Sequence, residues 1–268
     1  MENSQSPYSE RELQSPIVLD NLEFLKSLET RVKNHGVFDH PFLKKLSEQH
    51  YSGEAVLFIL IQIAKMVKPF TAALATLMGR APDIESRFVL FDNMFEEIGR
   101  GDVRQAHPVL YQKMLSSLGV PPALVEMQET ITSIRILNDA LCAAVSSKSF
   151  AVGCAWLGYG GEITIPNNFP YLIKATRTAF SGSAVNMEFW ERHGVRDQGH
   201  SDDATMLLAL NMTEEDYPDI EKAVFESLAI RKMIWDELKV YCESEGRALV
   251  DRRPHVQYEN PAASLIHS

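Results

Sequence analysis

Apolar side chains recur at helical spacing along nearly the whole chain, and this periodicity constrains the fold more than any other feature of the sequence. Residues 21–36 show an approximate apolar stripe, formed by Leu22, Phe24, Leu25, Leu28 and Val32. Spacings of three and four residues place side chains on one face of a helix. No segment between turn signals shows the alternation of apolar and polar residues that is typical of a half-buried strand. We therefore expect an all-α fold.

Capping and turn residues divide this pattern into separate helices. We expect one helix after a cap at Asp20, and another that begins after a cap at Asp83 and ends at Gly99. The other expected elements are helices over 54–67, 70–79, 107–118 and 123–147, a turn at 165–168, a helix that contains 193–200, and a last helix from 213 to about 245. Residues 1–16 are expected to be a flexible leader, 17–250 a single helical domain and 251–268 a C-terminal tail.

Composition narrows the class of partner. The 268 residues carry a formal net charge of -10, which argues against nucleic acid or an anionic membrane and favours a small-molecule substrate. The longest apolar run, residues 55–64, is shorter than the roughly 20 residues of a spanning helix, and the polar N-terminus does not resemble a signal peptide. We therefore expect a cytoplasmic protein without membrane contact. Three cysteines are expected to be reduced core thiols, because their number is odd and their spacing is wide.

The stretch HGVRDQGH holds three side chains that bind metals. His193, Asp197 and His200 are four and seven residues apart, so a helix would place them near one face. Imidazole and carboxylate together suit iron, zinc or manganese. The alternative is a solvated helix end or loop, which Gly194 and Gly199 favour because each costs a helix about 1 kcal/mol relative to alanine.

A second candidate lies in FEEIGRGDVRQAH. Glu96 and Glu97 end one expected helix, His107 begins the next, and Gly99 and Gly101 allow a tight return between them. This arrangement can bring a carboxylate and an imidazole together, although glutamates at a helix end are commonly solvated and a histidine before proline is commonly a surface or capping residue.

A third candidate is Glu162, which follows glycines at 158, 160 and 161. Glycines in an apolar helical run indicate close approach to another helix or to a ligand, and a carboxylate there is costly unless it is paired or bound to metal. The alternative is an exposed glutamate at a helix end. The three motifs together supply the inventory with which a helical protein holds two irons.

These motifs resemble those of the heme-oxygenase-like diiron oxidases and oxygenases. The likeness rests on E-E-x-G-x-G-x5-H, the lone glutamate and H-x3-D-x2-H, in this order over roughly residues 50–205. The upstream motif is similar to the branch that contains amino-acid and guanidine N-oxygenases and a chlorolysine-fragmenting enzyme. The resemblance implies a heme-oxygenase-like helical bundle without heme. It implies two Fe(II) ions held by Glu97, His107, Glu162, His193, Asp197 and His200.

Within this ligand set, Glu162 is implied as a bridging or mobile carboxylate with a catalytic role, and Glu96 stays an alternative to Glu97. The resemblance implies an Fe(II)- and O₂-dependent oxidoreductase that carries out N-oxygenation, oxidative C–C cleavage or desaturation on a small amino-acid-like or carboxylate metabolite, in a biosynthetic pathway. It is compatible with a homodimer and with an external electron donor.

Three other readings remain open from the sequence. The same scaffold supports cofactor-free oxidation of the quinone-cofactor-synthase type, in which the histidines would bind an organic substrate. A non-enzymatic helical interaction protein is the second alternative. Heme binding is the third, with His35 or His40 as axial ligand, but the clustered carboxylates suit non-heme metal better.

Overall fold

The computed structural model describes residues 7–48 and 51–243, and within them the side chains of residue 11 and of residues 193–202 lie outside the description. This described part is helical and contains no strand, which confirms the all-α prediction. The α-helices are α1 (Glu10–Leu13), α2 (Pro16–Val32), α3 (Pro41–Glu48), α4 (Gly53–Gly79), α5 (Ile84–Glu97), α6 (His107–Ser117), α7 (Pro122–Met127), α8 (Thr132–Ser147), α9 (Phe150–Leu157), α10 (Ile165–Ala179), α11 (Glu188–Asn211) and α12 (Tyr217–Glu243). Three short 3₁₀ turns are η1 (Val103–Gln105), η2 (Glu162–Thr164) and η3 (Glu214–Asp216).

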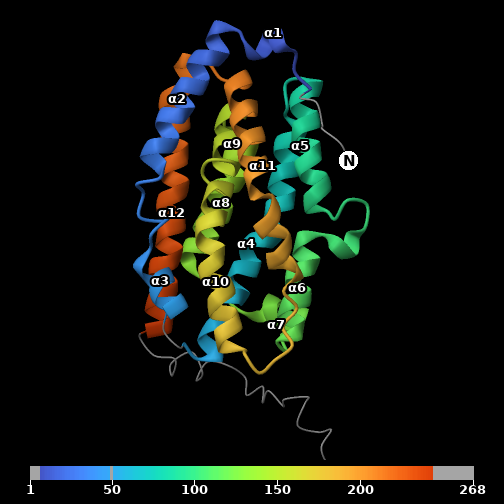
Figure 1. Ribbon diagram of the computed structural model, residues 1–268, viewed down its shortest axis with the longest axis vertical. Helices are drawn as coiled ribbons and strands as arrows, with labels where there is room; N and C mark the ends of the chain where they lie inside the picture. Colours follow the sequence, from blue (N-terminus) through green and yellow to red (C-terminus); the bar gives the residue numbers. More distant parts are fainter. Residues whose placement is uncertain (1–6, 49–50, 244–268) are drawn as a thin grey trace, which may run out of the picture.

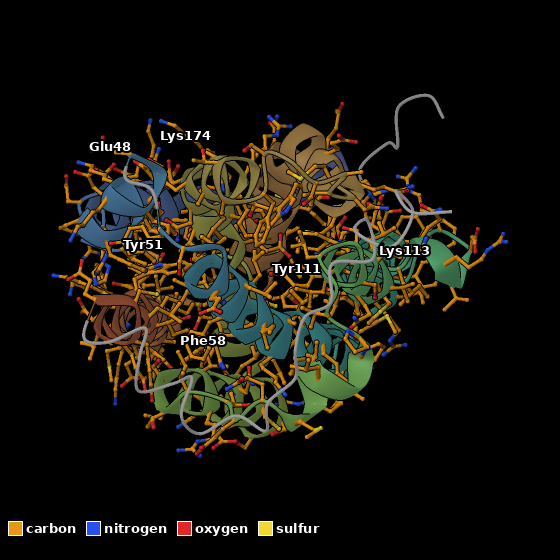
Figure 2. The ribbon with its side chains drawn as sticks, turned by 90° about the horizontal axis from the view of Figure 1, so that it is seen from below. Glu48, Tyr51, Phe58, Tyr111, Lys113 and Lys174 are labelled. Carbon is orange, nitrogen blue, oxygen red and sulfur yellow. The ribbon has the colours of Figure 1, made fainter. Side chains whose placement is uncertain are left out.

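The long helices stand side by side as an upright bundle, and α1 crosses one end of it (Figure 1). Helix α4 is central, because it packs against α5, α6, α8, α9 and α10. Helix α12 packs against α8 and α9, and α2 packs against α11. Figure 2 looks along the bundle and shows Tyr111, which is 1% exposed, inside it, while the exposed Lys174 lies at its edge. One continuous apolar core joins these helices.

Helix α4 runs without a break through Pro69, so the two separate helices expected over 54–67 and 70–79 were a wrong prediction. Proline lacks an N–H and therefore leaves the carbonyl four residues earlier without its helical partner. That carbonyl, Lys65 O, instead accepts a hydrogen bond of 3.0 Å from Asn138 Nδ2 of α8. The 27-residue helix is also long and apolar enough to cross a membrane, a test that core helices of globular proteins pass as well. Here its residues 56–63 are buried against neighbouring helices.

The single helix expected over 123–147 is divided into α7 and α8, and tertiary contacts explain the break. Gln62 of α4 is fully buried and forms two hydrogen bonds to the backbone of the segment between α7 and α8. Its Nε2 donates to Glu129 O at 2.8 Å, and its Oε1 accepts from Ile131 N at 3.0 Å. The carboxylate of Glu237 on α12 accepts from the backbone N–H groups of the first two residues of α8, at 3.1 and 2.8 Å. These bonds satisfy groups that the end of a helix leaves without partners.

Some boundaries also differ from expectation. Helix α2 begins at Pro16, so Asp20 lies inside it, and residues 10–13 of the expected leader form α1. Helix α10 begins at Ile165, so the turn expected at 165–168 is its first helical turn. Asp83 caps α5 as predicted, accepting from Ser86 N at 2.6 Å. The expected tail at 251–268 lies outside the described residues.

The three cysteines are free thiols, as predicted, but they differ in environment. Cys154 is buried, Cys242 is half-buried and Cys142 is exposed, so the prediction that all three lie in the core was wrong for Cys142.

Candidate metal centre and cavity

The turn between α5 and α6 brings a carboxylate and an imidazole together. Glu97 is the last residue of α5 and His107 is the first residue of α6. The chain reverses through Gly99 and Gly101, whose φ angles of 93° and 92° lie in the left-handed region that favours glycine. Glu97 Oε1 lies 2.8 Å from His107 Nδ1, and the two side chains are only 10% and 12% exposed. The contact that the spacing made plausible is therefore present.

The adjacent Glu96 takes a different partner. Its carboxylate forms an ion pair with Arg100 one helical turn later, and its side chain is 14% exposed. Both glutamates line the same cavity, but Glu97 is the one beside His107. The geometry thus favours Glu97 over Glu96 as a metal ligand, and the assignment of either as a ligand stays a prediction.

Glu162 reaches the cavity from a turn that is packed very closely against its neighbours. The prediction that the glycines permit close approach is confirmed, because a Cβ at Gly158 would lie 2.7 Å from the Cβ of Ala204 on α11, and one at Gly160 would lie 2.6 Å from the Cβ of Ser227 on α12. Glu162 Oε1 accepts a hydrogen bond of 3.3 Å from Asn93 Nδ2 of α5. The carboxylate therefore has a polar partner, as its position in an apolar region requires.

Helix α11 carries HGVRDQGH in its middle and continues through Gly194 and Gly199, as predicted. The side chains of His193, Asp197 and His200 lie outside the described residues. Among the described side chains, no group of three or more histidines, cysteines or acids has the arrangement of a metal site. Three of the six predicted ligands therefore lie outside the described side chains, and the six-ligand set stays a prediction.

The far end of α11 is fixed to the bundle by a buried amide. Asn21 of α2 is 1% exposed and donates hydrogen bonds of 2.8 Å to the carbonyls of Ala209 and Met212. Its own side-chain oxygen accepts from the hydroxyl of Tyr217, also at 2.8 Å. The helix that carries the downstream motif is thus held in register with α2 and α12.

The three glutamates and His107 line one cavity of about 570 Å³ inside the bundle. Helices α4, α5, α6, α8, α10, α11 and α12 contribute to its wall. This volume falls within the range of about 300–1,000 Å³ that is usual for sites that bind small organic molecules. The walls combine apolar side chains with a few polar ones, which is also typical of such sites.

Four polar residues at the cavity or its edge did not stand out in the sequence. They are Asn93, Asn168, Arg231 and Trp235. The sequence pattern could have identified Arg231 as a charged residue on a buried helix face. It lies on the same face of α12 as the buried Ser227, Leu228 and Trp235. The other three carry no sequence signal that separates them from ordinary helix residues.

Arg231 keeps its charge although it is enclosed. Its Nε donates a hydrogen bond of 2.6 Å to Gly160 O, and the hydroxyl of Ser227 donates to the same carbonyl at 2.8 Å. Burial lowers the pKa of Arg231 to about 10, while the nearby carboxylate of Glu162 acts in the opposite direction. The guanidinium therefore remains protonated at neutral pH.

Solved structures with the same architecture define the fold class as heme-oxygenase-like. A domain of unknown function with a heme oxygenase-like fold from Shewanella denitrificans OS217 superposes with a TM-score of 0.66 at 15% identity, over 90% of this chain and 100% of that one. A CADD-like protein of unknown function from Nostoc punctiforme PCC 73102 gives a TM-score of 0.71 at 16% identity, over 84% of this chain and 99% of that one. A TenA homologue from Pseudomonas syringae pv. tomato DC3000 gives 0.63 at 15% identity, over 89% and 98%.

The sequence profile of the iron-containing redox enzymes matches residues 57–234, and the chain belongs to this family. One curated relative is named 4-aminobenzoate synthase, from Chlamydia muridarum (strain MoPn / Nigg), and is 25% identical over 146 residues. That match covers 54% of this chain and 60% of the relative, so the chain spans about three-fifths of its length. The predicted family and fold are thereby confirmed, because the chain belongs to a family of iron-containing redox enzymes and has a heme-oxygenase-like fold.

Proposed function

We propose that this protein is an O₂-dependent diiron oxidase or oxygenase that acts on a small amino-acid-like or carboxylate metabolite. The observation that carries the proposal is the pair of Glu97 and His107, which lie 2.8 Å apart and mostly shielded from solvent at the wall of a cavity large enough for an organic substrate. Glu162 lines the same cavity. Membership of a family of iron-containing redox enzymes supports iron as the metal.

The donor chemistry at the cavity fits iron, because carboxylate and imidazole are the ligands of non-heme iron sites. Glu97, His107 and Glu162 would hold the metal from α5, α6 and η2. His193, Asp197 and His200 would complete the set from α11. Two ferrous ions, when bound, would supply two electrons to O₂.

The residues around these proposed ligands would contribute in different ways. Asn93 donates to Glu162 Oε1 and so limits the orientations of that carboxylate, which is the usual role of a hydrogen-bond partner behind a metal ligand. Arg100 neutralises Glu96, which leaves Glu97 as the glutamate available beside His107. Apolar side chains from α4 and α8 line the cavity, and such walls disfavour water beside a reactive site, which would limit side reactions.

The name of the Chlamydia relative supports the substrate class in the proposal. A 4-aminobenzoate molecule carries an amino group and a carboxylate on an apolar ring. The cavity offers the same combination of surfaces, with charged residues and apolar walls. We infer a substrate or product with these groups, without assigning the relative's own reaction to this chain.

The test is anaerobic loading with Fe(II), removal of excess metal, counting of bound iron, and exposure to O₂ with a panel of amino acids, aminobenzoates and fatty acids. We expect about two irons per chain, and O₂ uptake accelerated by one class of compound. His107→Ala and His200→Ala should each reduce iron binding and abolish turnover. His35→Ala is the matched control, because His35 lies outside the cavity lining and should retain both.

The alternative functions predict different results in this experiment. Turnover that survives complete chelation would replace the proposal with cofactor-free oxidation on the same scaffold. Full iron binding and activity in either histidine variant, His107→Ala or His200→Ala, would refute the assignment of that histidine as a ligand. No retained iron and no O₂ uptake with any compound would favour a non-enzymatic protein.

A further inference from the structure

The cavity contains polar groups that the described protein does not satisfy. Asn168 of α10 is 4% exposed and its Oδ1 has no hydrogen-bond partner among the described residues. Trp235 of α12 is 7% exposed, and its Nε1–H likewise has no acceptor there. Both residues line the cavity. Buried polar atoms without partners are rare and costly, so two of them at one cavity indicate a ligand that supplies the missing partners.

A cation accompanies these two groups. Three arginines line the cavity, and two of them are engaged, Arg100 with Glu96 and Arg192 with Glu188. Among the described residues, Arg231 donates a hydrogen bond through its Nε to a backbone carbonyl, and the carboxylate of Glu162 lies near its guanidinium. No described residue accepts a hydrogen bond from its terminal nitrogens. These nitrogens form a planar fork that matches the two oxygens of a carboxylate.

Arg231 and Trp235 act from one face of α12, because they are four residues apart. Both residues therefore contribute to one region of the cavity wall, and each can offer a hydrogen-bond donor. Asn168 adds an amide from α10. The apolar part of the wall comes from α4 and α8, and consists of Ile63, Met66, Val67, Phe70, Leu137 and Leu141.

We propose that Arg231 and Trp235 bind the carboxylate of the organic substrate, whose apolar part lies against α4 and α8 and whose second polar group meets Asn168. This inference rests on the proposed function in one respect, since it takes the cavity to be the substrate site. In this proposal the side chains of Arg231 and Trp235 bind the substrate carboxylate, whether or not a metal ion also binds it.

The test compares three probes of equal length, hexanoate, hexanamide and hexylamine, on the full chain. Binding is followed by tryptophan fluorescence and calorimetry without O₂, once after chelation and once after anaerobic Fe(II) loading. We expect hexanoate to bind about tenfold more tightly than hexanamide in both forms, because charge-assisted hydrogen bonds are about twice as strong as neutral ones. Hexylamine should bind most weakly.

Two variants separate anchoring from folding. Arg231→Gln should remove the preference for hexanoate over hexanamide, but it also alters the bond to Gly160 O. Trp235→Phe keeps an aromatic ring but removes the N–H together with part of the indole, so it should weaken hexanoate binding roughly three- to tenfold. Its loss of thermal stability should be no larger than that of Trp190→Phe, which removes the same atoms. Trp190→Phe is its matched control, since Trp190 is buried away from the cavity lining and its Nε1 lies 2.9 Å from the sulfur of Met114.

Four outcomes would overturn the proposed carboxylate anchor, that is, binding of the substrate carboxylate by Arg231 and Trp235. These outcomes are no binding by the chelated wild type, equal binding of hexanoate and hexanamide, a preference present only with iron, and affinity unaffected by Trp235→Phe. Iron content is counted on the same samples. A chain that binds iron and consumes O₂ but shows no carboxylate preference would refute the anchor alone, while a preference without iron binding would refute only the diiron proposal.

A second inference comes from the outer face of α5, which is independent of the cavity. Ile84, Phe88, Phe91, Phe95 and Ile98 form one stripe and are 65%, 52%, 50%, 37% and 44% exposed. Helix α5 lies at the edge of the bundle, where its inner face packs against α4 and α11 (Figure 1). The stripe residues follow one another at intervals of four, three, four and three. This is the spacing of the narrow seam through which one helix packs against another.

Charge flanks this stripe in a self-complementary way. Arg87 precedes Phe88 and Asp92 follows Phe91, so the two exposed charges border opposite edges of the stripe. In a parallel helix pair, residues at these two edges that are five apart in sequence face each other across the seam. Arg87 of one copy would then meet Asp92 of the other, and the reverse, as a two-fold axis requires.

We infer that the stripe of α5 is the interface of a parallel homodimer. Light scattering and sedimentation of the full chain at micromolar concentration should show a dimer. Phe91→Glu should produce a monomer, and Met127→Glu should not, because Met127 is 73% exposed on α7. Arg87→Glu should weaken the dimer, and the double variant Arg87→Glu with Asp92→Arg should restore it.

A monomeric wild type would refute this interface, and so would a dimer that Phe91→Glu leaves intact. Failure of the charge exchange to restore the dimer would refute the parallel orientation. Binding of the monomeric wild type to lipid vesicles, lost in Phe91→Glu, would assign the stripe to a membrane surface instead.

Discussion

Replacing Gly160 with alanine should push α12 away from the turn that leads to Glu162. An added Cβ would lie 2.6 Å from both the Cβ and the Oγ of Ser227, and 2.9 Å from the carbonyl oxygen of Trp156. Real Cβ contacts are longer, so the turn or the helix must move by roughly 1 Å, and Ser227 is fully buried. Overpacking of this kind costs about 1–3 kcal/mol. The unfolding temperature should fall by about 2–4 °C for each kcal/mol.

Thermal and urea unfolding measure this cost, and Gly182→Ala is the matched control. Nothing lies within 4 Å of a Cβ at Gly182, so that substitution should be neutral within about 0.5 kcal/mol. Ser227→Gly removes the opposing Cβ and should relieve the clash. We therefore expect the double variant, Gly160→Ala with Ser227→Gly, to have a higher free energy of unfolding than the sum of the two single effects predicts. The difference should be about 1 kcal/mol or more.

Two results would refute this reasoning. One is a Gly160→Ala variant as stable as the Gly182→Ala control. The other is strict additivity in the double variant, which would mean that the two positions do not touch. Iron content of Gly160→Ala should also be measured, because displacement of the turn moves Glu162.

Three further predictions follow from buried polar groups and thiols. Gln62→Leu should destabilise the protein by roughly 2–4 kcal/mol in urea unfolding, because it leaves a buried carbonyl and a buried N–H without partners; a stable variant would refute the role of Gln62 at the break between α7 and α8. Burial lowers the pKa of His40, so the unfolded chain binds more protons, and stability should fall as pH drops below about 6.5. His40→Gln should flatten that dependence in unfolding curves from pH 5 to 8, and an unchanged slope would contradict it. Maleimide should label Cys142 quickly and Cys154 only after unfolding, because Cys154 is buried and burial raises the pKa of its thiol; rapid native labelling of Cys154 would contradict the packing.

The fold class was readable from the sequence because helical periodicity is a local property. The cap at Asp83 was predictable for the same reason, since its side chain accepts from an amide three residues later in the chain. The wrong boundaries share the opposite cause. Pro69 looked like a helix end, yet Asn138 satisfies the carbonyl that it frees, from a helix about seventy residues away.

The break between α7 and α8 was also invisible, because residues 123–147 have a continuous helical pattern. Gln62 and Glu237 stabilise the interruption, and both come from other helices. A sequence window around the break contains neither residue. Contacts between segments distant along the chain therefore decided where these helices end.

The candidate site also has some features that local sequence patterns reveal and others that depend on contacts between distant segments. The sequence by itself determined which residues could bind metal, because imidazole and carboxylate at turn and helix spacings are local chemical patterns. Only the tertiary structure placed Glu97 rather than Glu96 beside His107, and gathered Arg231, Trp235 and Asn168 at one cavity. The physical reason is that a cavity is enclosed by several helices at once, and the orientation of each side chain there depends on how those helices pack.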